Sequence, residues 1–150
     1  MRVNIQRVTE AAVKINEVTI GEIKKGILVL LGIENEDNLE DIKWLTQKIS
    51  KLRIFPDTKA PMNKSVLDIN GDIIVVSQFT LFASTKKGNR PNFIFSGEPK
   101  FAEKMYHQFV DDLESIIGKK IKTGKFGADM KISLINDGPV TINIDSKRKE

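Results

Sequence analysis

The first third of the chain alternates apolar and polar positions with the period of two that is typical of β-strands. Three strands are expected there, over residues 3–9, 17–23 and 26–33. The run Ile27-Leu28-Val29-Leu30-Leu31 is apolar on both faces, as is usual for a strand in the middle of a sheet. This part of the chain therefore predicts a β-sheet with residues 26–33 near its centre.

Two later segments change to the period of an amphipathic helix. The first starts after Asn38, a good helix N-cap, and has acidic Glu40 and Asp41 in its first turn. The second starts near Pro99 and stops at Gly118. Their apolar stripes consist of Ile42, Leu45, Ile49 and Leu52 in the first helix and of Phe101, Met105, Phe109, Leu113 and Ile116 in the second.

The remaining segments are expected to be strands joined by tight turns. Asn70-Gly71 is a favoured hairpin turn, and a long strand should follow it over residues 72–83. Two closing strands, over residues 131–135 and 140–144, flank the turn Asn136-Asp137-Gly138-Pro139. Strands thus account for most of the chain outside the two helices.

A length of 150 residues suits one domain with a core of its own. The pattern predicts a single α+β domain over residues 1–150, in which mostly antiparallel, barrel-like β-layers are covered by two main helices. Residues 145–150 are expected to form a frayed tail. The chain has no apolar run near the roughly 20 residues of a membrane helix and no signal-peptide pattern, so we expect a cytoplasmic protein without a membrane partner.

The composition removes most of the common hydrolytic machinery. The chain contains no cysteine and one histidine, His107, which excludes a thiolate nucleophile, a zinc–thiolate site and a multi-histidine metal site. His107 falls on the face of its helix away from the apolar stripe, as expected of a surface residue. An enzyme with this composition must use backbone donors, hydroxyls, amides, carboxylates or groups of its substrate, and no metal or cofactor is expected.

The charge distribution favours an anionic partner. The net charge is +4, which suits nucleic acid but is weak evidence alone. Lys86, Lys87 and Arg90 crowd one loop directly after the long predicted strand. Five lysines over residues 119–131 form a second cluster, for which a solvated face is the simpler interpretation.

Polar residues interrupt the apolar strand predicted over residues 72–83. Unpaired buried polar groups cost about 1–3 kcal/mol each, so these side chains should either bond to one another or face a ligand. A period of two places Gln78 and Thr80 on one face and Ser77 with Phe79 on the other. From spacing alone a structural hydrogen-bond network is the simpler interpretation, and the adjacent basic loop favours the alternative, a pocket for a phosphate-bearing substrate.

Six short motifs follow one another along the chain. Two stand out, Ser77-Gln78-Phe79-Thr80-Leu81 and Asn136-Asp137-Gly138-Pro139-Val140-Thr141. The others are Gln6-Arg7-Val8, Arg53-Ile54-Phe55, Lys87-Gly88-Asn89-Arg90-Pro91 and Phe126-Gly127-Ala128-Asp129-Met130. Together they resemble the D-aminoacyl-tRNA deacylases over nearly the whole chain. Gly127 and Asn92 are small departures from the pattern.

This resemblance implies an enzyme that hydrolyses the ester bond of D-aminoacyl-tRNA and works as a homodimer with its active sites at the interface. The expected partner is aminoacylated tRNA, and neither a membrane nor DNA is expected. Ser77, Gln78, Phe79 and Thr80 would be the catalytic segment. A turn with a cis Gly138-Pro139 bond would reach across the interface into the neighbour's pocket.

The implied selection works by exclusion. The carbonyl oxygens of Gly138 and Pro139 would face the α-carbon of the aminoacyl group, accept hydrogen bonds from its ammonium, and occupy the space that an L side chain needs. Glycine has no side chain to exclude. Glycyl-tRNA is therefore expected to be a second substrate.

The expected chemistry relies on the backbone. Thr80 is a candidate nucleophile, but no base stands near it in the sequence. Backbone donors around Phe79 and Thr80 are therefore favoured as an oxyanion site. The 2′-hydroxyl of the substrate's own ribose would assist.

The remaining site residues are assigned to substrate binding. Arg7 would pair or hydrogen-bond near Gln78, or else be an exposed charge on an edge strand. Phe126 and Met130 would line a pocket for the terminal adenine, or else pack in the core. Phosphate contacts are assigned to the basic loop, Lys86, Lys87 and Arg90.

Three alternatives remain at this stage. The chain could be a non-catalytic RNA-binding domain, although such domains usually expose aromatic rings and most of the eight Phe residues here occupy core-like positions. The same scaffold could edit a different mispaired amino acid, with a trans Gly-Pro bond. It could also be a dimeric structural protein. Ester hydrolysis separates the first and third alternatives from the deacylase.

Overall fold

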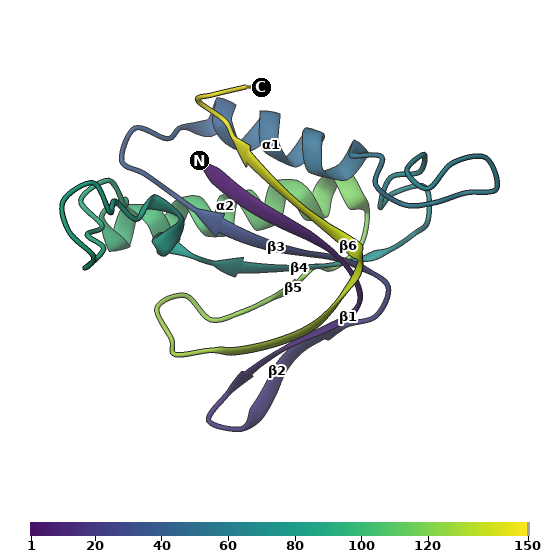
Figure 1. Ribbon diagram of the computed structural model, residues 1–150, viewed down its shortest axis with the longest axis horizontal. Helices are drawn as coiled ribbons and strands as arrows, with labels where there is room; N and C mark the ends of the chain where they lie inside the picture. Colours follow the sequence, from purple (N-terminus) through teal and green to yellow (C-terminus); the bar gives the residue numbers. More distant parts are fainter. Residues whose placement is uncertain (150) are drawn as a thin grey trace.

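A computed structural model describes residues 1–149 and shows a mixed sheet with both helices on one face (Figure 1). The sheet has six strands in the order β2-β1-β3-β4-β5, and β6 pairs with β1 outside this path. The elements are β1 (Arg2–Ile15), β2 (Val18–Ile23), β3 (Gly26–Gly32), α1 (Leu39–Lys51), β4 (Asp72–Ser77), the 3₁₀-helix η1 (Phe79–Phe82), α2 (Pro99–Ile117), β5 (Lys122–Thr123) and β6 (Lys131–Asp145). The predicted α+β class is confirmed.

Most of the sheet is attached to β1, which is longer than the first predicted strand. Residues 2–8 of β1 pair antiparallel with β3, and residues 11–15 pair antiparallel with β2. On its other side β6 runs antiparallel along both halves. Because one strand has different partners along its length, β2, the second half of β1 and the first half of β6 curl away from the helices (Figure 1). The pairs β3–β4 and β4–β5 are parallel.

Both predicted helices are confirmed, together with their caps. The Asn38 side chain accepts a hydrogen bond from the Glu40 amide at 2.8 Å, and the Asp41 carboxylate accepts one from the Asn38 amide at 3.0 Å, which forms a capping box. Gly118 ends α2 in the left-handed conformation. His107 is exposed, as predicted.

The central strands are buried on both faces. Ile27, Val29 and Leu31 of β3 belong to the larger core cluster under the two helices. Leu28, on the opposite face of β3, belongs to a second cluster inside the curl of β1. The run of apolar residues over 27–31 is therefore a central strand, as its sequence indicates.

The strand predicted over residues 72–83 is wrong beyond Ser77. The Gln78 amide still donates to the Leu31 carbonyl at 2.8 Å, but β3 ends at Gly32 and offers no partner further along. The chain turns into η1, where Phe79 is 55% exposed. The two faces predicted from a period of two do not exist here, because residues 79–82 are helical.

The predicted hairpin at Asn70-Gly71 is also wrong. Asn70 does occupy a turn, with φ of 49°. The strand after it, β4, pairs with β3 in parallel, so the connection runs through α1 and the long segment over residues 52–71. A favoured turn dipeptide determines the backbone conformation of its own residues. It does not determine with which strand the following strand pairs.

The two closing strands are one strand with a bulge. Gln6 pairs with Thr141, whereas Val8 pairs with Asn136, so residues 137–140 leave the ladder opposite Arg7 alone. The predicted turn therefore has the right position, but it interrupts β6 and does not join two strands. Within the bulge the Gly138-Pro139 bond is cis, and Gly138 has φ of +138°.

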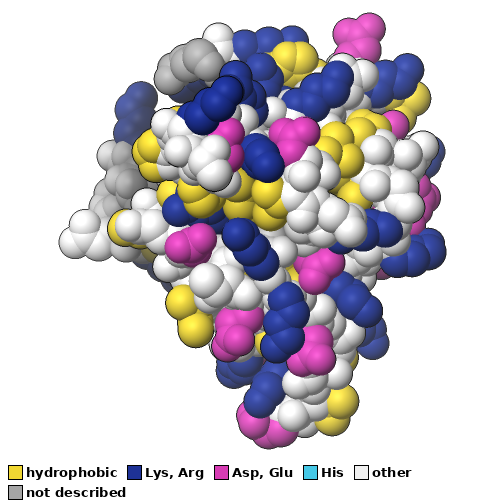
Figure 2. Space-filling view, turned by 90° about the vertical axis from the view of Figure 1, so that its right-hand side faces the viewer, with side chains coloured by type: hydrophobic (Ala, Val, Ile, Leu, Met, Phe, Trp, Pro, Cys, Tyr) yellow, Lys and Arg dark blue, Asp and Glu magenta, His cyan; other side chains and the backbone are white. Residues whose placement is uncertain are grey.

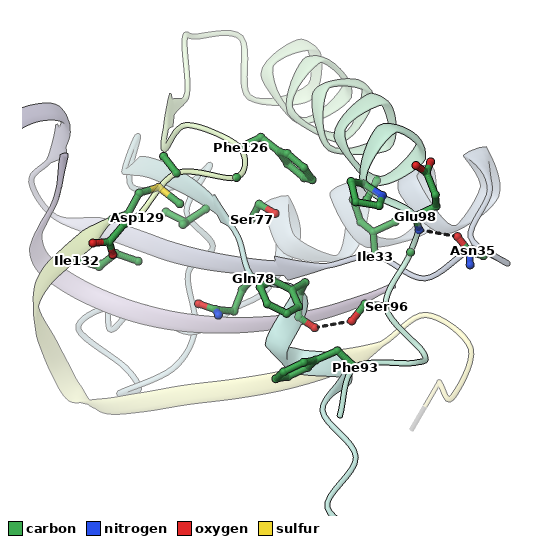
Figure 3. A pocket seen from close by; sticks show the side chains of 18 residues that line it. Ile33, Asn35, Ser77, Gln78, Phe93, Ser96, Glu98, Phe126, Asp129 and Ile132 are labelled. Atoms are coloured by element: carbon green, nitrogen blue, oxygen red, sulfur yellow. Dashed lines mark hydrogen bonds between the residues drawn. The ribbon is translucent and has the colours of Figure 1, made fainter. Parts of the chain in front are cut away.

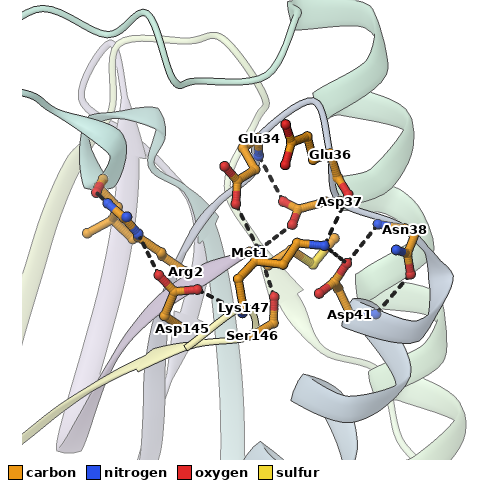
Figure 4. A network of polar contacts seen from close by, with 11 residues as sticks. Met1, Arg2, Glu34, Glu36, Asp37, Asn38, Asp41, Asp145, Ser146 and Lys147 are labelled. Carbon is orange, nitrogen blue, oxygen red and sulfur yellow. Dashed lines mark hydrogen bonds and ion pairs between the residues drawn. The ribbon is translucent and has the colours of Figure 1, made fainter. Parts of the chain in front are cut away.

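The frayed tail predicted over residues 145–150 is wrong for its first residues (Figure 4). Arg2 Nε donates to the Asp145 carboxylate at 3.0 Å. The Met1 amino group donates to Ser146 Oγ at 2.8 Å, and Ser146 is only 3% exposed. Lys147 Nζ donates to the Asp41 carboxylate at 2.8 Å. Glu150 lies outside the described residues.

Asp37 and Asp41, two carboxylates near the chain termini, have pKa values that are shifted in opposite directions. Burial raises the pKa of Asp37, and its hydrogen bond from the Met1 amino group offsets this only in part. Burial acts on Asp41 in the same direction, but hydrogen bonds from Lys147, from Ser146 and from the Asn38 backbone bring the pKa of Asp41 below its ordinary value. The tail thus stabilises the ionised form of Asp41.

Among residues 1–149 no helix is long and apolar enough to cross a membrane.

Replacing Lys147 with methionine should destabilise the protein by about 0.5–1 kcal/mol at neutral pH, the range of a partly exposed ion pair. Because the folded-state pKa of Asp41 is lowered, this contribution is present above the ordinary aspartate pKa and is lost as the pH falls through the folded-state value. Urea unfolding at pH 7 and at lower pH should show a difference that shrinks in acid. Lys43→Met, at an exposed position of α1, the helix that carries Asp41, is the control. A pH-independent loss for Lys147→Met would contradict the assignment.

Candidate active site

A cavity of about 690 Å³ lies between the carboxyl end of β4, the start of α2 and the loop before β6 (Figure 3). Its walls come from segments that are far apart in the sequence. It is lined by residues 76–79, Phe93, residues 96–99 and residues 126–130, with Ile33, Asn35, Ala102 and Ile132. Parallel strands commonly place ligand sites at their carboxyl ends, and β4 ends at this cavity.

The segment after β4 is held in place by hydrogen bonds on both sides. Its first amide, that of Gln78, is fixed by Leu31 of β3. Ser96 Oγ donates to the Phe79 carbonyl at 3.1 Å (Figure 3). The Phe79 ring packs edge-on against Phe93, with centroids 4.9 Å apart. The peptide between Phe79 and Thr80 is therefore positioned by two neighbouring segments.

The amides at the start of η1 are available for a ligand. A helix cannot bond its own first N–H groups, and the Gln78 side chain makes no cap hydrogen bond to them. It donates to Thr80 Oγ1 instead. The amides of Phe79 and Thr80 are thus the groups in this segment with the chemistry of an oxyanion site.

The structure brings most of the predicted catalytic segment to the cavity. Ser77, Gln78 and Phe79 line it, whereas Thr80 does not. The Thr80 hydroxyl accepts a hydrogen bond from an amide, which does not activate it as a nucleophile. The catalytic roles assigned to these four residues stay predictions.

Phe126 and Met130 both line the cavity, and both also pack against the core. The Phe126 ring lies 6.0 Å from the ring of Tyr106, and Met130 contacts the second core cluster. Burial raises the pKa of Tyr106 to about 12, and its hydroxyl donates to the Val75 carbonyl at 2.8 Å. Phe126 therefore lines the cavity and also packs against the core, and its contact with an adenine stays a prediction.

Arg7 does not pair near Gln78, and it is not an exposed edge charge. It is 8% exposed. Its Nε donates to the Asp137 carbonyl at 2.8 Å and lies 3.3 Å from the Asp137 carboxylate. Its Nη1 donates to the Ile54 carbonyl. Three of the sequence motifs meet at this arginine, and it holds the base of the Gly138-Pro139 bulge.

Two groups of predicted site residues lie outside the cavity. Gly138 and Pro139 are exposed and do not line it. Lys86, Lys87 and Arg90 are exposed on a loop closed by the bridge between Ser84 and Asn92. The basic loop and the bulge are therefore surface features, and their roles stay predictions.

Sequence reasoning missed the wall formed by Asn35 and residues 93–99. The Glu98 amide donates to Asn35 Oδ1 at 2.7 Å, and the Gly97 amide donates to the Ile33 carbonyl at 2.8 Å. These bonds hold the start of α2 against the end of β3. The only sequence signal is positional, since Asn35 follows a buried strand and Glu98 precedes a helix.

Two carboxylates line the cavity, and each already has a partner. Glu98 accepts a hydrogen bond from the Phe101 amide at 3.2 Å as the cap of α2. Asp129 forms an ion pair with Lys131 at 2.9 Å. Among the described residues no three His, Cys, Asp or Glu side chains gather in a group that could hold a metal ion.

The fold is similar to those of two solved structures. The c-Myc DNA Unwinding Element Binding Protein superposes with a TM-score of 0.91 at 41% identity, over 97% of this chain and 98% of that one. A probable eukaryotic D-amino acid tRNA deacylase superposes with a TM-score of 0.82 at 16% identity, over 95% and 98%. The second comparison supports the fold alone.

Sequence relatives identify the family. The model of the D-Tyr-tRNA(Tyr) deacylase family matches residues 4–145. The D-aminoacyl-tRNA deacylase of Flavobacterium psychrophilum is 61% identical over the whole of both chains, and that of Bacteroides fragilis is 55% identical over the same extent. The chain belongs to the D-Tyr-tRNA(Tyr) deacylase family. The predicted family and enzyme class are confirmed.

Replacing Arg7 with methionine should destabilise the fold by about 1–3 kcal/mol, because the carbonyls of Asp137 and Ile54 would lose their donor. Urea unfolding at neutral pH measures the change. Arg53→Met is the control, since Arg53 bonds only to exposed atoms of Asn63, and it should change stability by no more than about 0.5 kcal/mol. Equal losses for the two variants would contradict the role given to Arg7.

Proposed function

We propose that this chain hydrolyses the ester between a D-amino acid and the terminal ribose of tRNA, and that two copies of the chain complete each active site. One observation carries the second part. The cavity is lined by residues 77–79 and 126–130, whereas Gly138 and Pro139 lie outside it on an exposed bulge. A filter made of these two residues must then come from another copy.

The side of the molecule that carries the bulge suits such a contact. The end of the molecule at which β6 bends, the right-hand side in Figure 1, carries a band of apolar side chains between Lys and Arg residues (Figure 2). Contiguous apolar surface of this kind is typical of protein interfaces. We infer that a second copy covers it in a homodimer.

The filter needs glycine at position 138. At φ of +138° an L side chain is strained, and an added Cβ would lie 2.8 Å from Val140 Cγ2 and 2.9 Å from Arg7 Nη2. Arg7 fixes the base of the bulge, and Gly138 and Pro139 are exposed on it. In the proposed filter their carbonyls face the bound aminoacyl group. Carbonyls accept hydrogen bonds from the substrate's ammonium group, and here they occupy the space that an L side chain needs. The filter therefore accepts D substrates because it excludes the L enantiomer.

The reaction follows from the same groups. Water attacks the ester carbonyl carbon, and the amides of Phe79 and Thr80 stabilise the negative charge that develops on the carbonyl oxygen. The 2′-hydroxyl of the substrate's ribose assists the transfer of the proton from water. The bond to the ribose oxygen then breaks, that oxygen takes the proton, and the free amino acid and tRNA leave.

The substrate tRNA is held through its phosphates and its terminal adenine. Lys86, Lys87 and Arg90 contact phosphates, Phe126 and Met130 contact the terminal adenine, and tRNA is preferred over DNA. No metal or cofactor takes part. The reaction takes place in the cytoplasm and is a proofreading step of translation. The +4 net charge supports an RNA partner.

Incubation of the purified protein with D-tyrosyl-tRNA and L-tyrosyl-tRNA in the presence of a chelator tests this function. Release of the D-amino acid alone is expected, since the filter excludes the L form and the groups assigned to catalysis include no metal. Loss of neither ester would favour a binding module. Loss of both would show that the bulge does not select the enantiomer.

Replacing Thr80 with alanine should leave deacylation of D-tyrosyl-tRNA within about tenfold of the parent rate, because the backbone amide stays in place and loss of a true oxyanion donor would cost about 10²–10³. Single-turnover rates measure this. Thr80→Ser is the matched variant, and it should behave like the parent. A folded but inactive Thr80→Ala protein would show instead that the hydroxyl is the nucleophile.

Glycyl-tRNA should also be hydrolysed, because a filter that acts only by excluding L side chains has nothing to exclude in glycine. Its rate relative to D-alanyl-tRNA and L-alanyl-tRNA, charged on the same tRNA body, measures the filter directly. No turnover of glycyl-tRNA at high enzyme concentration would mean that the bulge selects the D side chain by attraction.

A further inference from the structure

An apolar surface continues outward from the cavity along residues 93–95. Phe93 lines the cavity and packs on Phe79 (Figure 3). The next two side chains point away from the core, and Ile94 is 76% and Phe95 56% exposed. Among residues 1–149, Ile94 and Phe95 are the only exposed large apolar residues that are consecutive in the sequence, and exposed apolar patches at the rim of a site commonly mark a binding surface.

The same segment adjoins the basic loop. Ser84 and Asn92 exchange backbone hydrogen bonds of 2.8 and 3.0 Å, which closes a loop that carries Lys86, Lys87 and Arg90. Residues 93–95 follow directly after this bridge. Figure 1 shows the whole region projecting from one end of the molecule, beside the start of α2. Cationic and apolar side chains therefore lie on consecutive segments at the rim of one cavity.

We infer that Ile94 and Phe95 form a stacking surface for the unpaired nucleotides directly 5′ of the substrate's terminal adenosine. This inference rests on the proposed function. If the aminoacyl-adenosine occupies the cavity, the RNA strand must leave through its rim. Single-stranded nucleotides are bound by aromatic side chains that stack with bases and by cations that contact the phosphates, and this rim offers both.

The two parts of the rim predict different salt dependence. Contacts between lysine and phosphate release counterions, so they weaken as the salt concentration rises. Stacking on Phe95 involves no ion pair. Loss of the phenyl ring should therefore reduce binding by the same factor at low and at high salt.

Substrates of increasing length test the inference. D-tyrosyl-adenosine, a D-tyrosylated CCA trinucleotide and D-tyrosyl-tRNA present the cavity ligand alone, then the two unpaired cytidines, then the whole tRNA. Phe95→Ala should leave kcat/KM for the adenosine ester unchanged. It should lower kcat/KM about tenfold for the trinucleotide and for the tRNA alike, through KM.

Three controls accompany the measurement. Phe95→Trp keeps a stacking ring and should retain the parent values. Val18→Ala removes an equally exposed apolar side chain, 64% exposed, from β2, and should have no effect on any substrate. Lys86→Gln combined with Lys87→Gln should lose affinity for tRNA at about 50 mM salt and show a smaller defect at about 200 mM.

Several results would overturn the inference. An equal loss on the adenosine ester would make Phe95 part of the cavity, and a dimer that dissociates in sedimentation experiments with Phe95→Ala would make it an interface residue. Parent-like kinetics of Phe95→Ala on all three substrates would refute the stacking surface and leave the proposed function intact. Failure of the unmodified protein to cleave any of the three esters would refute both.

Discussion

The buried guanidinium of Arg7 determines how β1 and β6 pair. A charged group taken out of water needs hydrogen-bond partners, and Arg7 finds them in the Asp137 and Ile54 carbonyls and in the Asp137 carboxylate. Opposite Arg7 the ladder between the two strands is interrupted over residues 137–140. The bulge, on which Gly138 and Pro139 are exposed, follows from this one interaction.

The rest of the proposed site depends on a second interruption, at the end of β4. There the sheet stops because β3 has ended at Gly32, and the chain enters η1, whose first amides receive no side-chain cap and whose first residue, Phe79, lines the cavity. The two interruptions lie on different parts of one chain. An enzyme that places backbone carbonyls against one side of its substrate and backbone amides against the other requires little from its side chains, which agrees with a composition lacking cysteine and nearly lacking histidine.

Much of the fold could be predicted from local patterns. The capping box at Asn38, the stop at Gly118 and the doubly buried strand over residues 27–31 each depend on neighbouring residues, so the sequence is sufficient for them. The predictions that depended on distant partners were wrong. The strand over residues 72–83 was extended past the end of β3, the turn at Asn70-Gly71 was given the wrong strand partner, and residues 145–147 were left unpaired although Asp41 and the Met1 amino group bind them.

The site was predictable to a similar degree. Motif resemblance found residues 77–79 and 126–130, which the fold brings to one cavity. It did not find residues 93–99, because their place in the wall depends on how the start of α2 is bonded to Asn35 and to the end of β3. It did not predict the contacts of Arg7, whose side chain bonds to Asp137 and Ile54, and the assignment of Arg7 to substrate binding stays a prediction.

Mixed dimers test the central claim that the bulge of one copy completes the cavity of the other. Ala128→Trp fills part of the cavity, which Ala128 lines, and leaves the bulge, whereas Gly138→Ala alters the bulge and leaves the cavity. The account predicts that each homodimer loses D-selective deacylation, and that the heterodimer of the two recovers about half the parent activity with full preference for D-tyrosyl-tRNA, because one of its two sites combines an intact cavity with an intact bulge. A heterodimer as defective as the two homodimers would contradict the account, because it would show that cavity and filter must belong to the same copy.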